Sequence, residues 1–199
     1  MNPELQQNIE RASRNLHGWC TLEKALALAE LILEIKPRKV IEIGVYGGRS
    51  LIPMALALHQ VGHGKGYGID PWSNQAALEG DVGKENADWW NTLDLEMIHR
   101  SCMSALRAEN LEDWAVILRC RSQDCVELFP GCQILHLDGN HSELVSCRDL
   151  DLYLPALQAD AYLWFDDADW ATTSKAVARL DQELTRIKQV GQCLLYQKL

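Results

Sequence analysis

The sequence predicts an α/β fold built on a mostly parallel, seven-stranded sheet. Short segments rich in β-formers alternate with helical segments of ten or more residues, and parallel neighbours need such crossover connections. A glycine-rich turn joins the first strand to the next helix, and residues 187–197 have the pattern of a hairpin turning near Gly191. The sheet is therefore expected to be Rossmann-like and doubly wound, with an antiparallel strand from the C-terminal hairpin at one edge.

Length and composition favour one folded unit. The chain has 199 residues, of which 47% are hydrophobic and 24% charged, as is typical of globular domains. It contains no internal repeat and no linker rich in Pro, Gly or Ser. We expect a single domain over 1–199 with an N-terminal helical extension over about 1–35.

The net charge and the cysteine content limit which binding partners and which cellular compartment are expected. A net charge of −9 disfavours nucleic acid and anionic membranes as partners. Residues 1–7 lack the basic and apolar regions of a signal peptide, so we expect a cytoplasmic protein. The seven cysteines include no C-x-x-C pair, which indicates reduced, buried thiols and not a disulfide scaffold or a zinc site.

The first elements follow from apolar periodicity and capping. A helix is predicted over 21–33, where Thr21 suits the N-cap and one face carries Leu22, Ala25, Leu26, Ala29, Ile32 and Leu33. The β-rich run over 39–43 follows, then a glycine turn over 44–48 and a helix over 50–59. Pro53 is compatible with that helix because it lies in the first turn.

The remaining elements alternate in the same way. Strands are predicted over 66–69, 114–119, 134–137 and 161–165. Helices are predicted over 91–109, 123–129, 142–158 and 172–186. Ligands of such sheets bind beyond the carboxyl ends of the strands, so the residues that follow each strand are the candidates for function.

The glycine turn and the acid after the second strand indicate a nucleoside ligand. Three glycines in Glu42–Ser50 let the backbone turn sharply at a helix start, where free N–H groups can hold an anion. Asp70 closes the second strand, where a carboxylate can accept both hydroxyls of a ribose. The alternative is a structural turn and a surface acid. The G-x-x-G-G spacing departs from G-x-G-x-x-G, which disfavours an NAD-binding oxidoreductase.

These motifs resemble those of class I S-adenosylmethionine (SAM)-dependent methyltransferases, most closely the small bacterial group that includes sugar O-methyltransferases. Arg121–Asp124 is similar to the segment that flanks the adenine in catechol O-methyltransferase. The resemblance implies that SAM is bound by the two strand ends and by this segment, through Glu42, Gly44, Tyr46, Gly47, Gly48, Ser50, Asp70, Ser122 and Gln123.

Carboxylates gather after the fourth and fifth strands. Asp138 follows one strand, and Asp166 and Asp167 follow the next. If these strands are neighbours, the carboxylates share one crevice, and an all-oxygen set favours Mg²⁺ or another hard divalent cation. The alternative is that Asp166 and Asp167 only cap the next helix. The resemblance implies that the three aspartates hold Mg²⁺ beside the acceptor hydroxyl.

One position departs from the pattern of the related sugar O-methyltransferases. They carry a second acid, a proposed general base, where this chain has Asn140, and an amide does not accept a proton near neutral pH. His141 matches a lysine proposed as base in catechol O-methyltransferase, and histidine has a reference pKa near 6.5. We therefore predict His141 and Asp138 as catalytic residues. The alternative for His141 is a helix-start residue facing solvent, and His136 is expected to be structural.

The polar segment 71–90 is expected to be a loop over the crevice. It is bracketed by Trp72 and by Trp89 and Trp90, and long insertions at such sites are commonly lids. The alternative is that these indoles anchor the loop to the body of the protein.

Taken together, these patterns predict a SAM-dependent, Mg²⁺-assisted O-methyltransferase. Its acceptor is expected to be a small hydroxylated molecule, such as a sugar or a glycosylated natural product, and a homo-oligomer is compatible with the sequence. The alternatives are a non-catalytic SAM-binding protein and a related metal-dependent hydroxylase-like enzyme. An NAD-binding oxidoreductase is less favoured.

Overall fold

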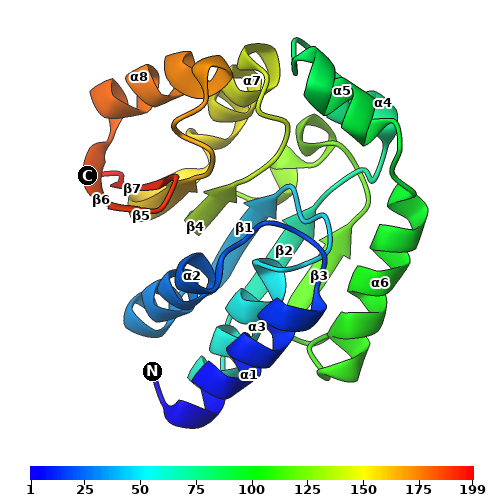
Figure 1. Ribbon diagram of the computed structural model, residues 1–199. Helices are drawn as coiled ribbons and strands as arrows, with labels where there is room; N and C mark the ends of the chain where they lie inside the picture. Colours follow the sequence, from blue (N-terminus) through cyan, green and yellow to red (C-terminus); the bar gives the residue numbers. More distant parts are fainter.

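A computed structural model describes residues 1–199 and contains one seven-stranded sheet with the order β3-β2-β1-β4-β5-β7-β6 (Figure 1). Strands β1 to β5 pair in parallel, whereas β7 pairs antiparallel with both β5 and β6. The predicted fold class, including the antiparallel hairpin strand, is therefore confirmed. The strands are β1 Lys39–Ile43, β2 Lys65–Ile69, β3 Ala115–Leu118, β4 Cys132–Leu137, β5 Leu157–Phe165, β6 Thr185–Val190 and β7 Cys193–Gln197.

Helices cover both faces of the sheet. On one face, α1, α2, α3 and α6 contribute to a core cluster of 30 buried residues. On the other face, α7 and α8 contribute to a second cluster of 19. The helices are α1 Pro3–Asn15, α2 Leu22–Ile35, α3 Leu51–Val61, α4 Asn74–Ala77, α5 Lys84–Trp90, α6 Leu95–Ala108, α7 Glu143–Tyr153 and α8 Ser174–Glu183.

The helix after the glycine turn is buried on every side. All residues of α3 from Leu51 to Leu58 are buried, because α3 packs on the sheet and is itself covered by α1 and α2. Pro53 is tolerated there because it lies in the first turn, where its missing N–H breaks no helical bond. The N-terminal helices thus fix the helix that follows the glycine turn.

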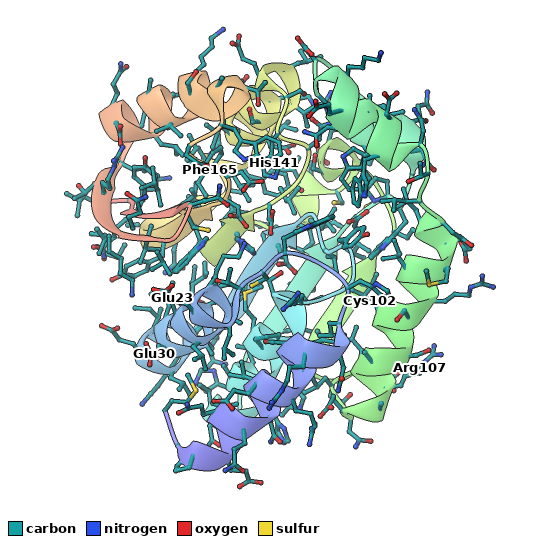
Figure 2. The ribbon with its side chains drawn as sticks, in the orientation of Figure 1. Glu23, Glu30, Cys102, Arg107, His141 and Phe165 are labelled. Carbon is teal, nitrogen blue, oxygen red and sulfur yellow. The ribbon has the colours of Figure 1, made fainter.

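Helix α6 shows the two-sided pattern of a helix at the edge of the core. Asp94 caps it, since its carboxylate accepts a hydrogen bond of 2.9 Å from the Met97 backbone N–H. Cys102 is fully buried, whereas Arg107 on the same helix points toward the periphery (Figure 2). None of the seven cysteines forms a disulfide, and five of them are buried, as the sequence predicted.

Four strands end in the same register, which aligns the candidate functional residues. The paired last residues of β2, β1, β4 and β5 are Ile69, Ile43, Leu137 and Phe165. The residues that follow them are Asp70, Gly44, Asp138 and Asp166. The ladder continues one step further, because the Asp138 N–H donates to the Ile43 carbonyl at 2.8 Å and the Asp166 N–H donates to the Leu137 carbonyl at 2.9 Å.

Three segments differ from the sequence-based expectation. The helix expected over 123–129 is two single 3₁₀ turns, Ser122–Asp124 and Val126–Leu128, interrupted at Cys125. The segment 71–90 is not a plain loop, since it contains α4 and α5. Strand β5 begins at Leu157, within the helix expected over 142–158, because α7 already ends at Tyr153 and the chain turns there into the sheet.

None of the helices combines the length and the apolar character needed to cross a bilayer.

The first prediction concerns the close packing of Gly44 beneath β4. Gly44 has φ 89°, and a Cβ there would lie 1.9 Å from the Asp138 carbonyl oxygen. Gly62 is a matched control, with φ 82° and no neighbour within 4 Å of a Cβ. Both alanine variants carry backbone strain of about 1–3 kcal/mol. Steric overlap should make Gly44→Ala less stable than Gly62→Ala by roughly another 1–3 kcal/mol or more. Denaturant unfolding measures the difference, and equal midpoints with equal slopes would contradict it.

Candidate active site

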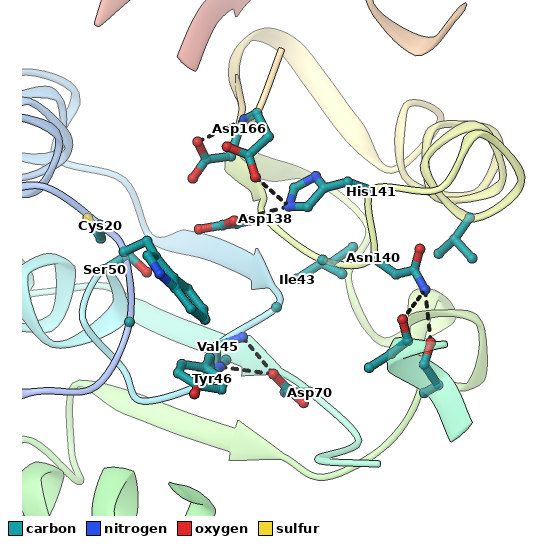
Figure 3. A pocket seen from close by; sticks show the side chains of 18 of the residues that line it. Cys20, Ile43, Val45, Tyr46, Ser50, Asp70, Asp138, Asn140, His141 and Asp166 are labelled. Carbon is teal, nitrogen blue, oxygen red and sulfur yellow. Dashed lines mark hydrogen bonds and ion pairs between the residues drawn. The ribbon is translucent and has the colours of Figure 1, made fainter. Parts of the chain in front are cut away.

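A cavity of about 670 Å³ lies beyond the carboxyl ends of the strands (Figure 3). Its walls come from the glycine turn, the segment 70–73, the helices α4 and α5, and the residues that follow β3, β4 and β5. A volume of this size is typical of small-molecule and cofactor pockets. The in-register strand ends thus open into one shared cavity.

Asp70 holds the glycine turn in place. One carboxylate oxygen accepts hydrogen bonds from the backbone N–H groups of Val45 (3.0 Å) and Tyr46 (2.9 Å) (Figure 3). The other oxygen accepts a hydrogen bond from the backbone N–H of Trp72 (2.7 Å). Burial raises the pKa of Asp70, and these three hydrogen bonds partly oppose that rise. A carboxylate has about four lone-pair sites, so one position remains for a ligand hydroxyl. Asp70 therefore shapes the turn as well as facing the cavity.

The predicted cofactor residues divide into two groups. Gly44, Tyr46, Ser50, Asp70 and Ser122 line the cavity. The other four are not among the residues that line the cavity, and their role as cofactor contacts stays a prediction. Gln123 is exposed outside the cavity, whereas Glu42, Gly47 and Gly48 are buried beneath it.

The buried three are explained by packing. A Cβ on Gly47 would lie 2.3 Å from the His17 carbonyl oxygen, and one on Gly48 would lie 2.8 Å from the Cys102 sulfur. Packing against the N-terminal segment and α6 therefore requires glycine at both positions. Glu42 accepts hydrogen bonds from Ser50 and from the ring of His136, and burial raises the pKa of its carboxyl.

The wall after β3 carries a polar network. Ser122 is buried and its hydroxyl donates to Asp149 at 2.6 Å. Burial raises the pKa of Asp149 to about 6, although the bond from Ser122 opposes that shift. Nearby, Glu79 accepts hydrogen bonds from Arg121 and Arg148. These bonds join the segment after α4 to the residues that follow β3 and to α7.

Asp138 and Asp166 meet a lysine that the sequence analysis did not single out. The Lys24 ammonium contacts the Asp166 carboxylate and lies 3.5 Å from Asp138 Oδ2. Lys24 is only 6% exposed and is the only buried lysine or arginine of the chain. Burial raises the pKa of Asp138, but the Lys24 charge and the rings of His141 and His136 outweigh it and lower the pKa to about 2. For Lys24, burial lowers the pKa, and anionic neighbours led by Asp138 raise it above its usual value.

The three predicted metal ligands are not arranged as one set. Atoms of Asp138 and Asp166 approach within 4.8 Å of each other and of His136, whereas the Asp167 carboxylate turns to His141 instead. Asp166 Oδ1 accepts hydrogen bonds from the Cys193 thiol and from the Asp167 N–H. Mg²⁺ needs about six oxygen ligands at roughly 2.1 Å, and here an ammonium, a thiol and an imidazole surround the carboxylates. These residues do not fit a hard cation as they stand.

His141 faces the cavity between two carboxylates, not solvent. Its Nε2 lies 3.3 Å from Asp167 Oδ2 and 3.6 Å from Asp138 Oδ1. Its ring centroid lies 5.3 Å from that of Trp170, at an interplanar angle of 54°, and Trp170 is 36% exposed. Carboxylates that hold an imidazole in place are a familiar arrangement for a general base.

Neither Asp166 nor Asp167 caps α8, whose N-cap is Thr173.

Asn140 anchors the segment above the cavity. Its amide nitrogen lies 3.0 Å from each of the carbonyl oxygens of Ala76, Ala77 and Glu79 (Figure 3). The Ser142 hydroxyl also donates to the Glu79 carbonyl at 2.9 Å. Asparagine at this position therefore fixes the α4 turn against the end of β4, a role that an acid, which cannot donate when ionised, would not perform.

Aromatic rings form the wall opposite His141. Trp19 lies 5.1 Å from Tyr46 and 5.0 Å from Trp89, and Tyr46 lies 6.0 Å from Trp90, measured between ring centroids. Trp72 is buried and its ring N–H donates to the Tyr46 carbonyl at 2.9 Å. Trp72 therefore anchors the segment 71–90, while Trp89 and Trp90 line the cavity.

The helical spacing of Lys24 relative to apolar residues of α2 indicates that its side chain is buried. Lys24 shares a helical face with Leu28 and Leu31, both buried on α2. The face expected from the sequence instead included Leu22, which is exposed. A lysine one helical turn from buried leucines, just after the N-cap Thr21, indicates a charge directed into the protein.

Solved structures with a similar fold include methyltransferases. An O-methyltransferase of Streptomyces achromogenes, described as involved in tomaymycin synthesis and in complex with SAM, is 15% identical, with a TM-score of 0.64 over 100% of this chain and 92% of that one. An O-methyltransferase of Bacillus cereus in complex with S-adenosylhomocysteine (SAH) is 13% identical, with a TM-score of 0.64 over 100% and 92%. An SAH-bound methyltransferase of Podospora anserina is 10% identical, with a TM-score of 0.69 over 99% and 88%.

The sequence itself matches a family model. No curated protein sequence is significantly similar to the chain. The model described as a methyltransferase domain matches residues 41–168, a range that runs from β1 to just beyond Asp166 and Asp167 and so contains the strand ends that form the cavity. The resemblance inferred from the glycine turn and Asp70 is confirmed, and the chain belongs to this family of methyltransferase domains.

Proposed function

We propose that this protein transfers a methyl group from SAM to a hydroxyl of a small acceptor. The observation that carries the proposal is the single cavity in which a glycine turn clasped by Asp70 and a histidine held by two carboxylates line the same space. The family match supports methyl transfer, and a base in this position supports oxygen as the acceptor atom.

The cofactor side of the cavity suits SAM. The Asp70 carboxylate retains capacity to accept a ribose hydroxyl after bonding three N–H groups. Ser122 lines the wall after β3, where the sequence resemblance puts the adenine. Bound SAM supplies a methyl group on a positively charged sulfur, and the protein's task is to align the acceptor with it.

The acceptor side supplies the base. As the acceptor oxygen forms its bond to the methyl carbon, the electron pair of the broken sulfur–carbon bond stays on sulfur and neutral SAH results. His141 takes the hydroxyl proton. The carboxylates of Asp138 and Asp167 both lie at Nε2 and keep it protonated, so Nδ1 is the nitrogen that takes the proton, and the two carboxylates stabilise the positive charge that the ring acquires. No step of this proposal passes through a metal ion.

The walls favour an acceptor with a flat or apolar face. Trp19, Tyr46, Trp89 and Trp170 all line the cavity, and aromatic faces bind both sugar rings and aromatic rings by stacking. A sugar or a glycosylated natural product fits these walls. The similar O-methyltransferase involved in tomaymycin synthesis supports a natural-product acceptor.

The second prediction tests the cofactor. Wild-type protein should bind SAH but not NAD in calorimetric titrations. Asp70→Ala should weaken SAH binding roughly ten- to hundredfold, the equivalent of about 1.5–3 kcal/mol for a lost hydrogen bond to a charged group. Circular dichroism checks that the variant is folded, and Asp113→Ala, an exposed aspartate, is the matched control. SAH affinity that is the same in both variants would refute the role of Asp70.

The third prediction tests the base. Against a panel of hydroxylated acceptors, His141→Ala should lower kcat by about 10²- to 10⁴-fold while SAH affinity stays unchanged, because a general base acts in the transition state. His63→Ala is the matched control, since His63 precedes β2 at the opposite end of the sheet.

The same measurements test the alternatives to catalysis. SAH binding without turnover of any acceptor would favour a non-catalytic binding protein. Turnover of His141→Ala at the wild-type rate would show that another group removes the proton.

A further inference from the structure

Two carboxylates at the centre of the cavity are already neutralised by the chain itself. Asp138 and Asp166 follow adjacent strands, and their side chains are 24% and 6% exposed. Like charges this close repel unless a cation lies between them. The Lys24 ammonium supplies that charge, in contact with Asp166 and 3.5 Å from Asp138 Oδ2.

We propose that Lys24 takes the place of a divalent cation in this active site, so that the protein works without a metal. The inference rests on the proposed function only for its consequence in catalysis. The geometry of the Asp138–Asp166 pair, with Lys24 between the two carboxylates, does not depend on that function. Lys24 lines the cavity and acts as a positioning residue, because its ammonium contacts the carboxylates of Asp138 and Asp166.

The surroundings of the pair exclude a second cation. Asp166 is committed on both oxygens, to Lys24 on one and to the Cys193 thiol at 2.7 Å and the Asp167 N–H at 2.9 Å on the other. His136 closes the pair from the sheet side, with Nε2 at 3.8 Å from Asp138 and 3.9 Å from Asp166. A hard cation would have to displace the ammonium and find oxygen ligands among these groups.

The position of Lys24 is fixed by its helix. It lies in the first turn of α2, where its backbone N–H donates to the Thr21 side chain at 3.2 Å. Leu28, one turn later, is 1% exposed. The Lys24 side chain is only 8% exposed, and its ammonium faces the two carboxylates. A cation held in this way is a permanent part of the site, unlike an exchangeable ion.

The consequence for catalysis is a division of roles. A divalent metal would lower the pKa of a bound hydroxyl, whereas the Lys24 ammonium is engaged by the two carboxylates. Proton removal then depends on His141. Lys24 holds Asp138 in the orientation in which its other oxygen, Oδ1, faces the His141 ring at 3.6 Å.

The fourth prediction is tested with the metal alone. Calorimetric titration of the wild-type protein with MgCl₂, and electron paramagnetic resonance with Mn²⁺ as a second probe, should show no saturable binding at millimolar concentration. Lys24→Met keeps the length and apolar stem of the side chain but removes its charge. That variant should bind Mn²⁺ at least about tenfold more tightly than wild type, because the paired carboxylates become free to ligate it. Lys188→Met, at an exposed position of β6, should behave as wild type.

Further variants and a parallel SAH titration distinguish failure of the Lys24 proposal from misfolding of the variant and from failure of the proposed function. If Lys24→Met does not fold, Lys24→Arg, which keeps a cation, should remain folded and still exclude Mn²⁺. Saturable Mg²⁺ binding by the wild-type protein that is lost in Asp138→Asn would overturn the inference, as would Mn²⁺ binding by folded Lys24→Met no tighter than by wild type. SAH binding is measured in parallel, and its absence would refute the proposed function while leaving the metal titration valid.

Discussion

The shared register of the ends of β2, β1, β4 and β5 is the constraint on which the site depends. Backbone hydrogen bonds carry the ladder past Ile43 and Leu137 to the first residues beyond the strands. These bonds fix the main chain at Asp138 and Asp166 as firmly as within a strand, so their side chains are directed before any ligand arrives. Electrostatic preorganisation of this kind requires a rigid scaffold. The sheet therefore sets the position of the cavity.

Placing carboxylates on a rigid frame creates a charge that must be balanced. Breaking a buried ion pair by removing one partner commonly costs about 3–5 kcal/mol, because the remaining charge is left uncompensated. Lys24 balances Asp166 and Asp138, and His136 bonds Glu42 beneath them. Through Lys24 the N-terminal helix α2 becomes part of the site, although the family match begins only at residue 41. The charge balance therefore joins the N-terminal helices to the methyltransferase core.

The two sides of the cavity are built differently, in keeping with their proposed roles. The cofactor side is made of main chain held by a carboxylate, with Asp70 bonding three N–H groups. The acceptor side is made of side chains, with the aromatic rings of Trp19 and Trp89 facing the polar group around His141. Asn140, just after β4, holds the α4 segment in place through contacts with three of its carbonyl oxygens. A site built of main chain and a site built of side chains thus share a single cavity.

The sequence by itself determined the elements and the edge of the sheet at which function lies. Periodicity and Thr21 predicted α2, the glycine turn and Asp70 indicated the methyltransferase fold, and aspartates after two strands predicted a carboxylate cluster. Local patterns suffice there because strand ends in a parallel sheet converge on one edge. Only the tertiary structure decided what surrounds those residues. It assigned Gly47 to packing against His17 and brought Lys24 to a pair of carboxylates more than 100 positions away in the chain. Such partners are chosen by helix docking and burial, which no spacing within the sequence encodes.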